Sequence, residues 1–148
     1  MSAPRLIAQG CPALLASAPN TRLLVLVHLK ATVAGASGAA TLVGDIDATS
    51  GDAGSTPGLT ITRQAAGTYD VTFPACRQVY WGTFRCNVFP AVIATGTEGR
   101  QASIDKTDAN TSAKLGKLRF NVIANGGSTV TDPVDGSEIH LSFWADYG

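Results

Sequence analysis

The sequence predicts an all-β chain that folds as an antiparallel β-sandwich or jelly roll in a single domain. Three observations predict this fold class. Apolar and polar residues alternate in several short runs, turn-forming residues separate these runs, and no stretch of useful length has the period of an amphipathic helix. A chain of 148 residues has the usual size of one domain and can bury a single core without disulfides.

The first two segments differ in character. Residues 1–20 contain three prolines and no clear period, so we expect an extended arm, followed by one β-domain over residues 21–148. Residues 22–33 read as a strand in which Val25 and Val27 share one face with other apolar residues, while Leu24 and Leu26 lie on the opposite face. Apolar character on both faces predicts a strand that is covered on both sides, by the core and by a neighbour.

The middle of the chain contains the strongest hairpin signal. Residues 35–58 are rich in glycine and other turn formers, with a short apolar piece near residues 41–43. Two alternating runs then fill residues 59–73, joined by a loop over 64–67 that ends in glycine, which predicts a β-hairpin with one buried face. Pro74 ends the second strand because proline cannot donate a hydrogen bond to the ladder.

Three more strands are predicted beyond this hairpin. They cover residues 85–95, interrupted by Pro90, then 117–124 and 138–147, with a polar loop over 106–114. We expect the core to contain the apolar residues that share one face of these strands and of the hairpin: Leu59, Ile61, Tyr69, Val71, Phe73, Phe120, Val122, Ile139, Leu141 and Phe143.

Composition limits the classes of partner. Eleven basic and eleven acidic residues give no net charge, and no basic run stands out, so we expect neither a nucleic acid nor a membrane surface as partner. The longest apolar run, residues 23–27, is far shorter than the roughly 20 residues that cross a bilayer. Charged residues make up only 15% of the chain, which is expected if other subunits cover much of its surface, or if that surface is rich in uncharged polar residues.

The sequence contains no pattern that predicts an enzyme or a cofactor. Neither His28 nor His140 has an acid and a nucleophile at the spacing of a known triad, and the glycines lie in turns rather than in a nucleotide-binding loop. Asp45, Asp47 and Asp52 are a candidate calcium site, but their spacing does not fit an EF-hand, and solvated loop acids are the simpler interpretation.

Cysteine and aromatic residues leave alternatives open. If residues 76–86 form a tight hairpin near Trp81, Cys76 and Cys86 lie opposite each other and can form a disulfide; free thiols are the alternative in a reducing compartment. The sequence assigns no role to Cys11. Tyr80 and Trp81 are expected in a turn and Trp144 on the polar face of the last strand, where these aromatics serve a subunit contact, a sugar platform or local packing.

Residues 58–73 and 132–143 resemble small capsid-decorating (cement) or fibre-associated proteins of tailed bacteriophages, which have a jelly roll similar to that of the C1q and tumour-necrosis-factor group. The resemblance covers residues 58–143 at most. In that group a Gly-x-Tyr-x-Val/Phe-x-Phe strand and a short C-terminal strand pack near a three-fold axis. The matching residues here are Gly67, Tyr69, Val71 and Phe73 for the first strand, and Ile139, Leu141 and Phe143 for the second.

The resemblance implies a homotrimeric, non-enzymatic virion component, made in the host cytoplasm, whose partner is the major capsid protein. The alternative is a receptor- or carbohydrate-binding module of a phage tail or fibre. The expected interface residues are Leu24, Leu26, Tyr80, Trp81 and Trp144.

Overall fold

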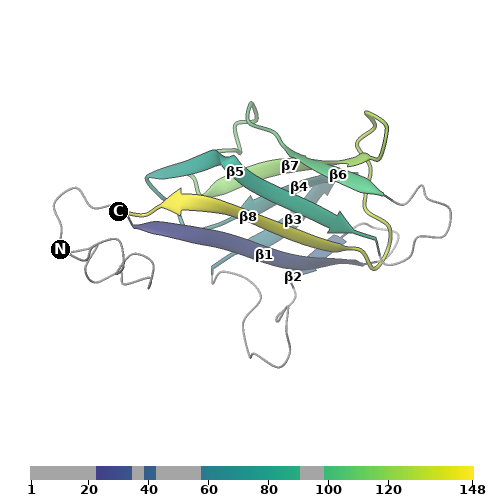
Figure 1. Ribbon diagram of the computed structural model, residues 1–148, viewed down its shortest axis with the longest axis horizontal. Coiled ribbons are helices and arrows are strands. Elements are labelled where there is room, and N and C mark those ends of the chain that lie inside the picture. Colours follow the sequence, from purple (N-terminus) through teal and green to yellow (C-terminus); the bar gives the residue numbers. More distant parts are fainter. Residues whose placement is uncertain (1–22, 35–38, 43–57, 91–98) are drawn as a thin grey trace, which may run out of the picture.

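The computed structural model describes residues 23–34, 39–42, 58–90 and 99–148, and these contain eight β-strands and no α-helix (Figure 1). No helix within these ranges is long and apolar enough to cross a membrane. The strands are β1 (Leu24–Ala34), β2 (Ala39–Leu42), β3 (Thr60–Ala65), β4 (Thr68–Thr72), β5 (Gln78–Phe89), β6 (Arg100–Ile104), β7 (Lys117–Ala124) and β8 (Glu138–Asp146).

The strands form two four-stranded sheets, which confirms the predicted β-sandwich. Sheet A has the order β2-β1-β8-β5 and sheet B the order β3-β4-β7-β6, and every pairing is antiparallel. Figure 1 shows sheet A in front, with β8 between β1 and β5, and sheet B behind it. The edge strands of the two sheets approach each other at both sides, β2 beside β3 and β5 beside β6.

The core lies between the sheets and contains all ten residues that the sequence predicts for it. Tyr69 stacks on Phe120 with ring centroids 5.5 Å apart, both from sheet B, and Phe73 contacts Phe143 of sheet A edge-on at 5.1 Å. The predicted strands at 22–33, 117–124 and 138–147 and the hairpin at 59–73 are confirmed to within two residues. Alternation therefore located the strands that contribute these ten core residues.

Strand β5 departs from the prediction. The sequence predicts a turn at Tyr80 and Trp81, but residues 78–89 form one continuous strand that ends just before Pro90. The register explains the discrepancy. Tyr80 pairs with Trp144 and Arg85 with Ser142, so five positions along β5 match two along β8, and three additional residues form a bulge. Strand β6 is also absent from the prediction, because only Ala102 and Ile104 of its five residues are apolar and face the core.

A segment that follows β7 fastens the hairpin of β3 and β4. The Asp132 carboxylate accepts hydrogen bonds from Arg63 Nε and Nη2 at 2.8 and 2.7 Å and from the Gly67 backbone N–H at 2.8 Å. Gly67 has a φ of +69°, and a Cβ atom there would lie 2.5 Å from the Thr131 backbone nitrogen. The residue must be glycine because the turn and this segment are in backbone contact.

We predict that Asp132→Asn lowers the free energy of unfolding by about 2 kcal/mol at neutral pH, because hydrogen bonds to a charged group are lost. The Arg63 guanidinium, more than any other group, holds the pKa of Asp132 below its ordinary value of 3.8. Because the folded-state pKa is the lower one, the contribution of the carboxylate is complete above about pH 4 and disappears as the pH falls through the folded-state pKa. Urea denaturation of both proteins between pH 7 and pH 2.5 should show two curves that converge in acid; parallel curves would contradict this.

The turn before β7 offers a second, pH-independent test of the fold. Gly116, just before β7, and Gly126, just after it, both have positive φ angles, +62° and +73°. A Cβ atom on Gly116 would overlap the carbonyl oxygen of Phe73, whereas one on Gly126 would meet nothing within 4 Å. We predict that Gly126→Ala lowers the free energy of unfolding by about 1 kcal/mol through backbone strain, and that Gly116→Ala lowers it by roughly 2 kcal/mol more through the added clash. Equal losses in chemical denaturation would show that the turn moves freely away from β4.

Candidate interaction face on sheet A

The outer face of sheet A carries most of the large apolar side chains that the described residues leave exposed. The seven such side chains are 36–61% exposed, and two of them, Leu115 and Val130, lie in connections on either side of β7. Of the other five, Leu24, Leu26, Phe89 and Trp144 lie on β1, β5 and β8, whereas Leu23 immediately precedes β1 and has the parity of Val27, which faces the core. A concentration of exposed apolar residues on one face indicates an interaction surface.

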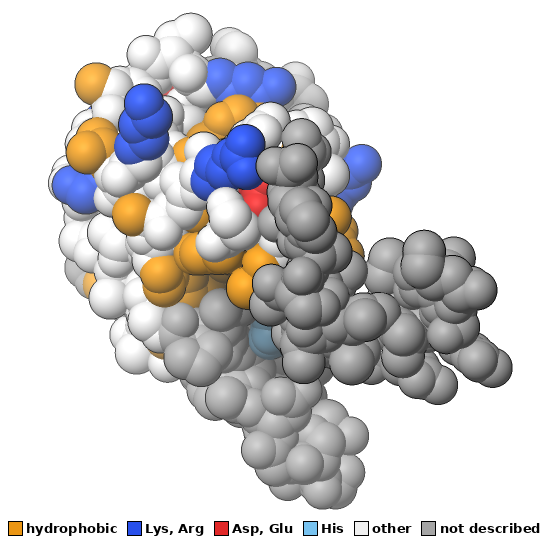
Figure 2. Space-filling view, turned by 90° about the vertical axis from the view of Figure 1, so that its left-hand side faces the viewer, with side chains coloured by type: hydrophobic (Ala, Val, Ile, Leu, Met, Phe, Trp, Pro, Cys, Tyr) orange, Lys and Arg blue, Asp and Glu red, His pale blue; other side chains and the backbone are white. Residues whose placement is uncertain are grey.

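Strand pairing gathers three of these side chains and a tyrosine at one end of the face. Leu26 pairs with Trp144 across β1 and β8, and Tyr80 pairs with Trp144 across β5 and β8. Leu24, Tyr80, Thr83 and Trp144 line a shallow groove of about 310 Å³. We call Leu24, Leu26, Tyr80 and Trp144 the apolar patch. In a view of the end where β1 begins and β8 ends, hydrophobic side chains gather in one area (Figure 2).

The bulge in β5 shapes the groove. Thr83 Oγ1 donates a hydrogen bond to the Tyr80 carbonyl at 2.6 Å and accepts one from the Trp144 backbone N–H at 2.9 Å. The bulged residues are thereby fixed to β8 although they lie outside the regular ladder. Arg85 Nη1 adds bonds to the carbonyl oxygens of Gly82 and Phe84 at 3.2 and 2.7 Å.

A second depression, of about 180 Å³, lies farther along the same face, and five of its seven lining residues have polar side chains. We call it the polar hollow. His28 and Ser142 are directly paired across β1 and β8, and Arg85 is paired with Ser142 from the other side, so three strands contribute to it. Its lining residues are His28, Leu29, Arg85, Asn87, His140, Leu141 and Ser142.

Glu138 marks the margin of the polar hollow. Its carboxylate lies 2.9 Å from His140 Nε2 and 3.6 Å from Lys30 Nζ. The hydrogen bond with His140, and secondarily the charge of Lys30, lower the pKa of Glu138. The ring of Phe89 meets His140 edge-on, with centroids 4.9 Å apart. The Glu138 carboxylate is therefore already bonded to one lining residue, His140, and paired with Lys30.

The histidines and Ser142 share one face. Within the described residues Ser142 Oγ has no hydrogen bond to either imidazole, so the contacts of a Ser-His-acid triad are not present there. The same ranges contain no group of three or more His, Cys, Asp or Glu residues placed to hold a metal ion.

Of the five predicted interface residues, four come together. Leu24, Leu26, Tyr80 and Trp144 all belong to the apolar patch. Trp81 lies apart from these four, because its side chain packs against the core, with its ring centroid 6.2 Å from that of Phe143. Within one chain only one face of β1 is covered: Val27 is fully buried, whereas Leu24 and Leu26 are 47% and 44% exposed, so a neighbour over the second face stays a prediction.

The hairpin that would have placed Cys76 opposite Cys86 does not exist. Cys76 lies before β5 and Cys86 within it, on one extended stretch of chain, and both thiols are free. The Cys86 side chain packs against the core, where desolvation raises the pKa of its thiol to about 12. The arm at 1–20, which includes Cys11, and the acids Asp45, Asp47 and Asp52 lie outside the described residues.

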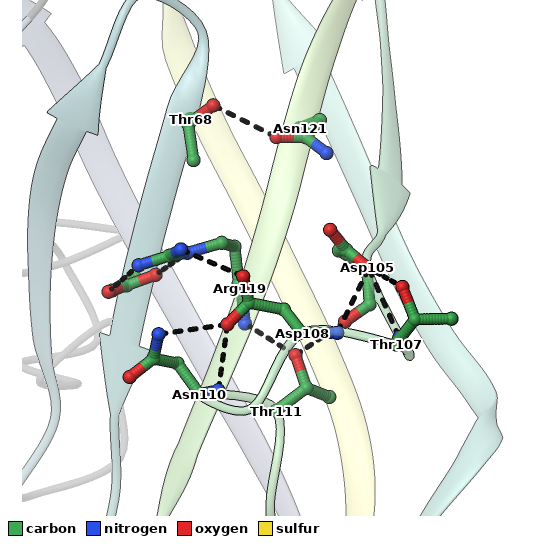
Figure 3. A network of polar contacts seen from close by, with 9 residues as sticks. Thr68, Asp105, Thr107, Asp108, Asn110, Thr111, Arg119 and Asn121 are labelled. Atoms are coloured by element: carbon green, nitrogen blue, oxygen red, sulfur yellow. Dashed lines mark hydrogen bonds and ion pairs between the residues drawn. The ribbon is translucent and has the colours of Figure 1, made fainter.

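The outer face of sheet B is chemically different. Arg119 of β7 donates from Nε and Nη2 to the two carboxylate oxygens of Asp70 at 2.6 and 2.8 Å, and from Nη1 to Asp108 at 2.8 Å (Figure 3). The Asn110 backbone and side-chain N–H groups bind Asp108 as well and contribute most to lowering its pKa. Arg119 and the two aspartates are therefore paired with one another, and through Asp108 they fasten the loop at 105–111 to the sheet. Their role is structural.

No pattern in the sequence predicted the polar hollow as a site. Arg85 and Asn87 lie beyond the bulge, which the sequence does not reveal, and the two histidines were weighed only as catalytic residues. The sequence held one signal. His28 and His140 both occupy positions that face outward on predicted strands, and the pairing of β1 with β8 brings them to one face.

A scan against protein-family models, a search of curated proteins and a search of solved structures each found no significant match to this chain.

Proposed function

We propose that this chain is a non-enzymatic structural protein that assembles with copies of itself through the outer face of sheet A. The observation that carries the proposal is the apolar patch, in which residues from three adjacent strands expose leucine and aromatic side chains on one surface. Sheet B supports the choice of face, because Arg119 on its outer side is already paired with Asp70 and Asp108, and none of the exposed large apolar side chains of the described residues belongs to its strands.

The energetics of the patch favour such an assembly. Burying one large apolar side chain contributes about 1.5–3 kcal/mol, so a few of these residues provide the core of a contact. A stable interface covers roughly 800 Å² on each partner, which extends the contact beyond the patch onto the polar residues beside it. An apolar centre with a polar rim is the usual arrangement of such interfaces.

We propose further that the assembly is a homotrimer that decorates and stabilises a bacteriophage capsid. This finer assignment comes from the resemblance of residues 58–73 and 132–143 to capsid-decorating proteins. Closed cyclic symmetry buries a self-matching surface without leaving an open end. A trimer attached at three equivalent points binds a shell far more tightly than one copy does, since the second and third contacts form at high effective concentration. Residues 1–20 are our candidate for a contact with the major capsid protein.

The first test concerns assembly. We predict that the full chain sediments as a trimer at micromolar concentration and that Leu26→Glu shifts it to a monomer that is still folded, because Leu26 is exposed in the single chain. Gln101→Glu, on the exposed side of β6, is the matched control and should sediment as a trimer. Circular dichroism verifies folding of both variants. A monomeric wild-type chain at this concentration counts against the proposal.

The second test concerns the shell. Phage particles that carry the protein should release their DNA at a higher temperature than particles that lack it, because binding to the assembled shell favours that state. A chain without residues 2–20 should still assemble but attach more weakly in co-sedimentation with shells. Equal attachment of the shortened chain would show that the arm plays no part.

A second candidate function is binding of carbohydrate, which the groove between Tyr80 and Trp144 specifically favours. Two aromatic side chains side by side, next to a hollow with several hydrogen-bond donors, are what a sugar-binding surface requires. A glycan array with wild-type protein and Trp144→Ala separates the two functions: saccharide binding that depends on Trp144, in a protein that ignores shells, would favour this candidate.

A further inference from the structure

Only one nitrogen of the Arg85 guanidinium, Nη1, donates hydrogen bonds within the described part of the chain. Nη1 donates to two backbone carbonyl oxygens, those of Gly82 and Phe84, which use both of its hydrogens and anchor the group to the bulge of β5. Within the described ranges, Nε and Nη2 have no acceptor. Together they form the edge from which arginine binds both oxygens of a carboxylate.

Two other arginines of this chain show what that edge binds. Arg63 holds the two oxygens of Asp132 from Nε and Nη2 at 2.8 and 2.7 Å. Arg119 holds Asp70 through the same two nitrogens at 2.6 and 2.8 Å. For Arg85, the described part of the chain supplies no such carboxylate.

The surroundings of Arg85 are suited to one. Arg85 lines the polar hollow together with Asn87 and Ser142, and within the described residues neither of these two side chains has a hydrogen-bond partner. No lining residue is acidic. The nearby acid, Glu138, is already bonded to His140 and Lys30. The hollow of about 180 Å³ admits a small group rather than a drug-sized ligand.

We propose that the polar hollow is a carboxylate-binding site. The Nε–Nη2 edge of Arg85 binds the two carboxylate oxygens, and the Asn87 amide and the Ser142 hydroxyl donate further hydrogen bonds. The carboxylate has two possible sources, a free small molecule or an acidic side chain that another copy of the chain inserts. This site goes beyond the proposed function, because it adds a ligand of defined chemistry to a face that was assigned only by its apolar residues.

The site is tested on the full-length protein by calorimetry and by amide chemical shifts, with sodium acetate and glucuronate as probes and neutral glucose as the control ligand. We expect acetate and glucuronate to bind with dissociation constants on the order of millimolar and to shift the signals of Arg85, Asn87 and Ser142. Arg85→Lys keeps the positive charge but loses the paired Nε and Nη2 donors, so it should weaken binding about tenfold. Ser142→Ala should weaken it roughly fivefold, and Lys106→Gln, remote from sheet A, should leave it unchanged.

Sedimentation distinguishes the two sources. If the carboxylate is a free molecule, Arg85→Lys leaves the assembled fraction unchanged while acetate binding falls. If another copy supplies it, Arg85→Lys lowers the assembled fraction, and excess acetate does the same to the wild-type protein. The proposal is overturned if acetate neither binds nor alters assembly and Arg85→Lys changes neither quantity. A monomeric chain that binds acetate at Arg85 retains this site and refutes only the assembly.

Discussion

The antiparallel pairing of β1 with β8 is the constraint on which both the core and the interaction face depend. Nine consecutive residue pairs join these strands, from Leu24 with Asp146 to Thr32 with Glu138. This single register turns Val27 and Phe143 into the core and leaves Leu26 and Trp144 outside. A shift by one residue would exchange the two faces, burying polar groups and exposing the core. The same pairing brings His28 beside Ser142, so the polar hollow exists only in this register.

Much of this structure could be predicted because alternation records which side of a strand is buried. In β4, β7 and β8 and at the start of β3, buried apolar residues recur at every second position, whereas β1 is apolar on both faces and was predicted as a strand from its composition; the predicted boundaries of all five are close to the observed ones. The period fails in β5. The bulge between Tyr80 and Arg85 changes the parity, so that both Trp81 and Phe84 pack toward the core. The alternation pattern of one strand does not reveal a bulge, because which residues are unpaired depends on the register with the neighbouring strand.

The candidate site was predictable to a smaller degree. Leu24, Leu26 and Trp144 could be singled out as apolar residues on outward parity, but their meeting depends on pairing between strands more than a hundred residues apart. Arg85 gave no sequence signal at all. Its significance depends on which nitrogens are already used by the carbonyls of Gly82 and Phe84, and this is a property of geometry alone.

The edges of the two sheets also limit how copies of this protein can join. Among the described strands, the edge strands β2 and β6 have only four and five residues, while β3 and β5 carry register shifts. Short or kinked edges present no straight row of backbone donors and acceptors to which another chain can add a strand. Growth into fibrils by edge-to-edge pairing is thereby discouraged. Association between copies is directed instead to side-chain surfaces on the faces of the sheets, where contacts can close into an assembly of finite size.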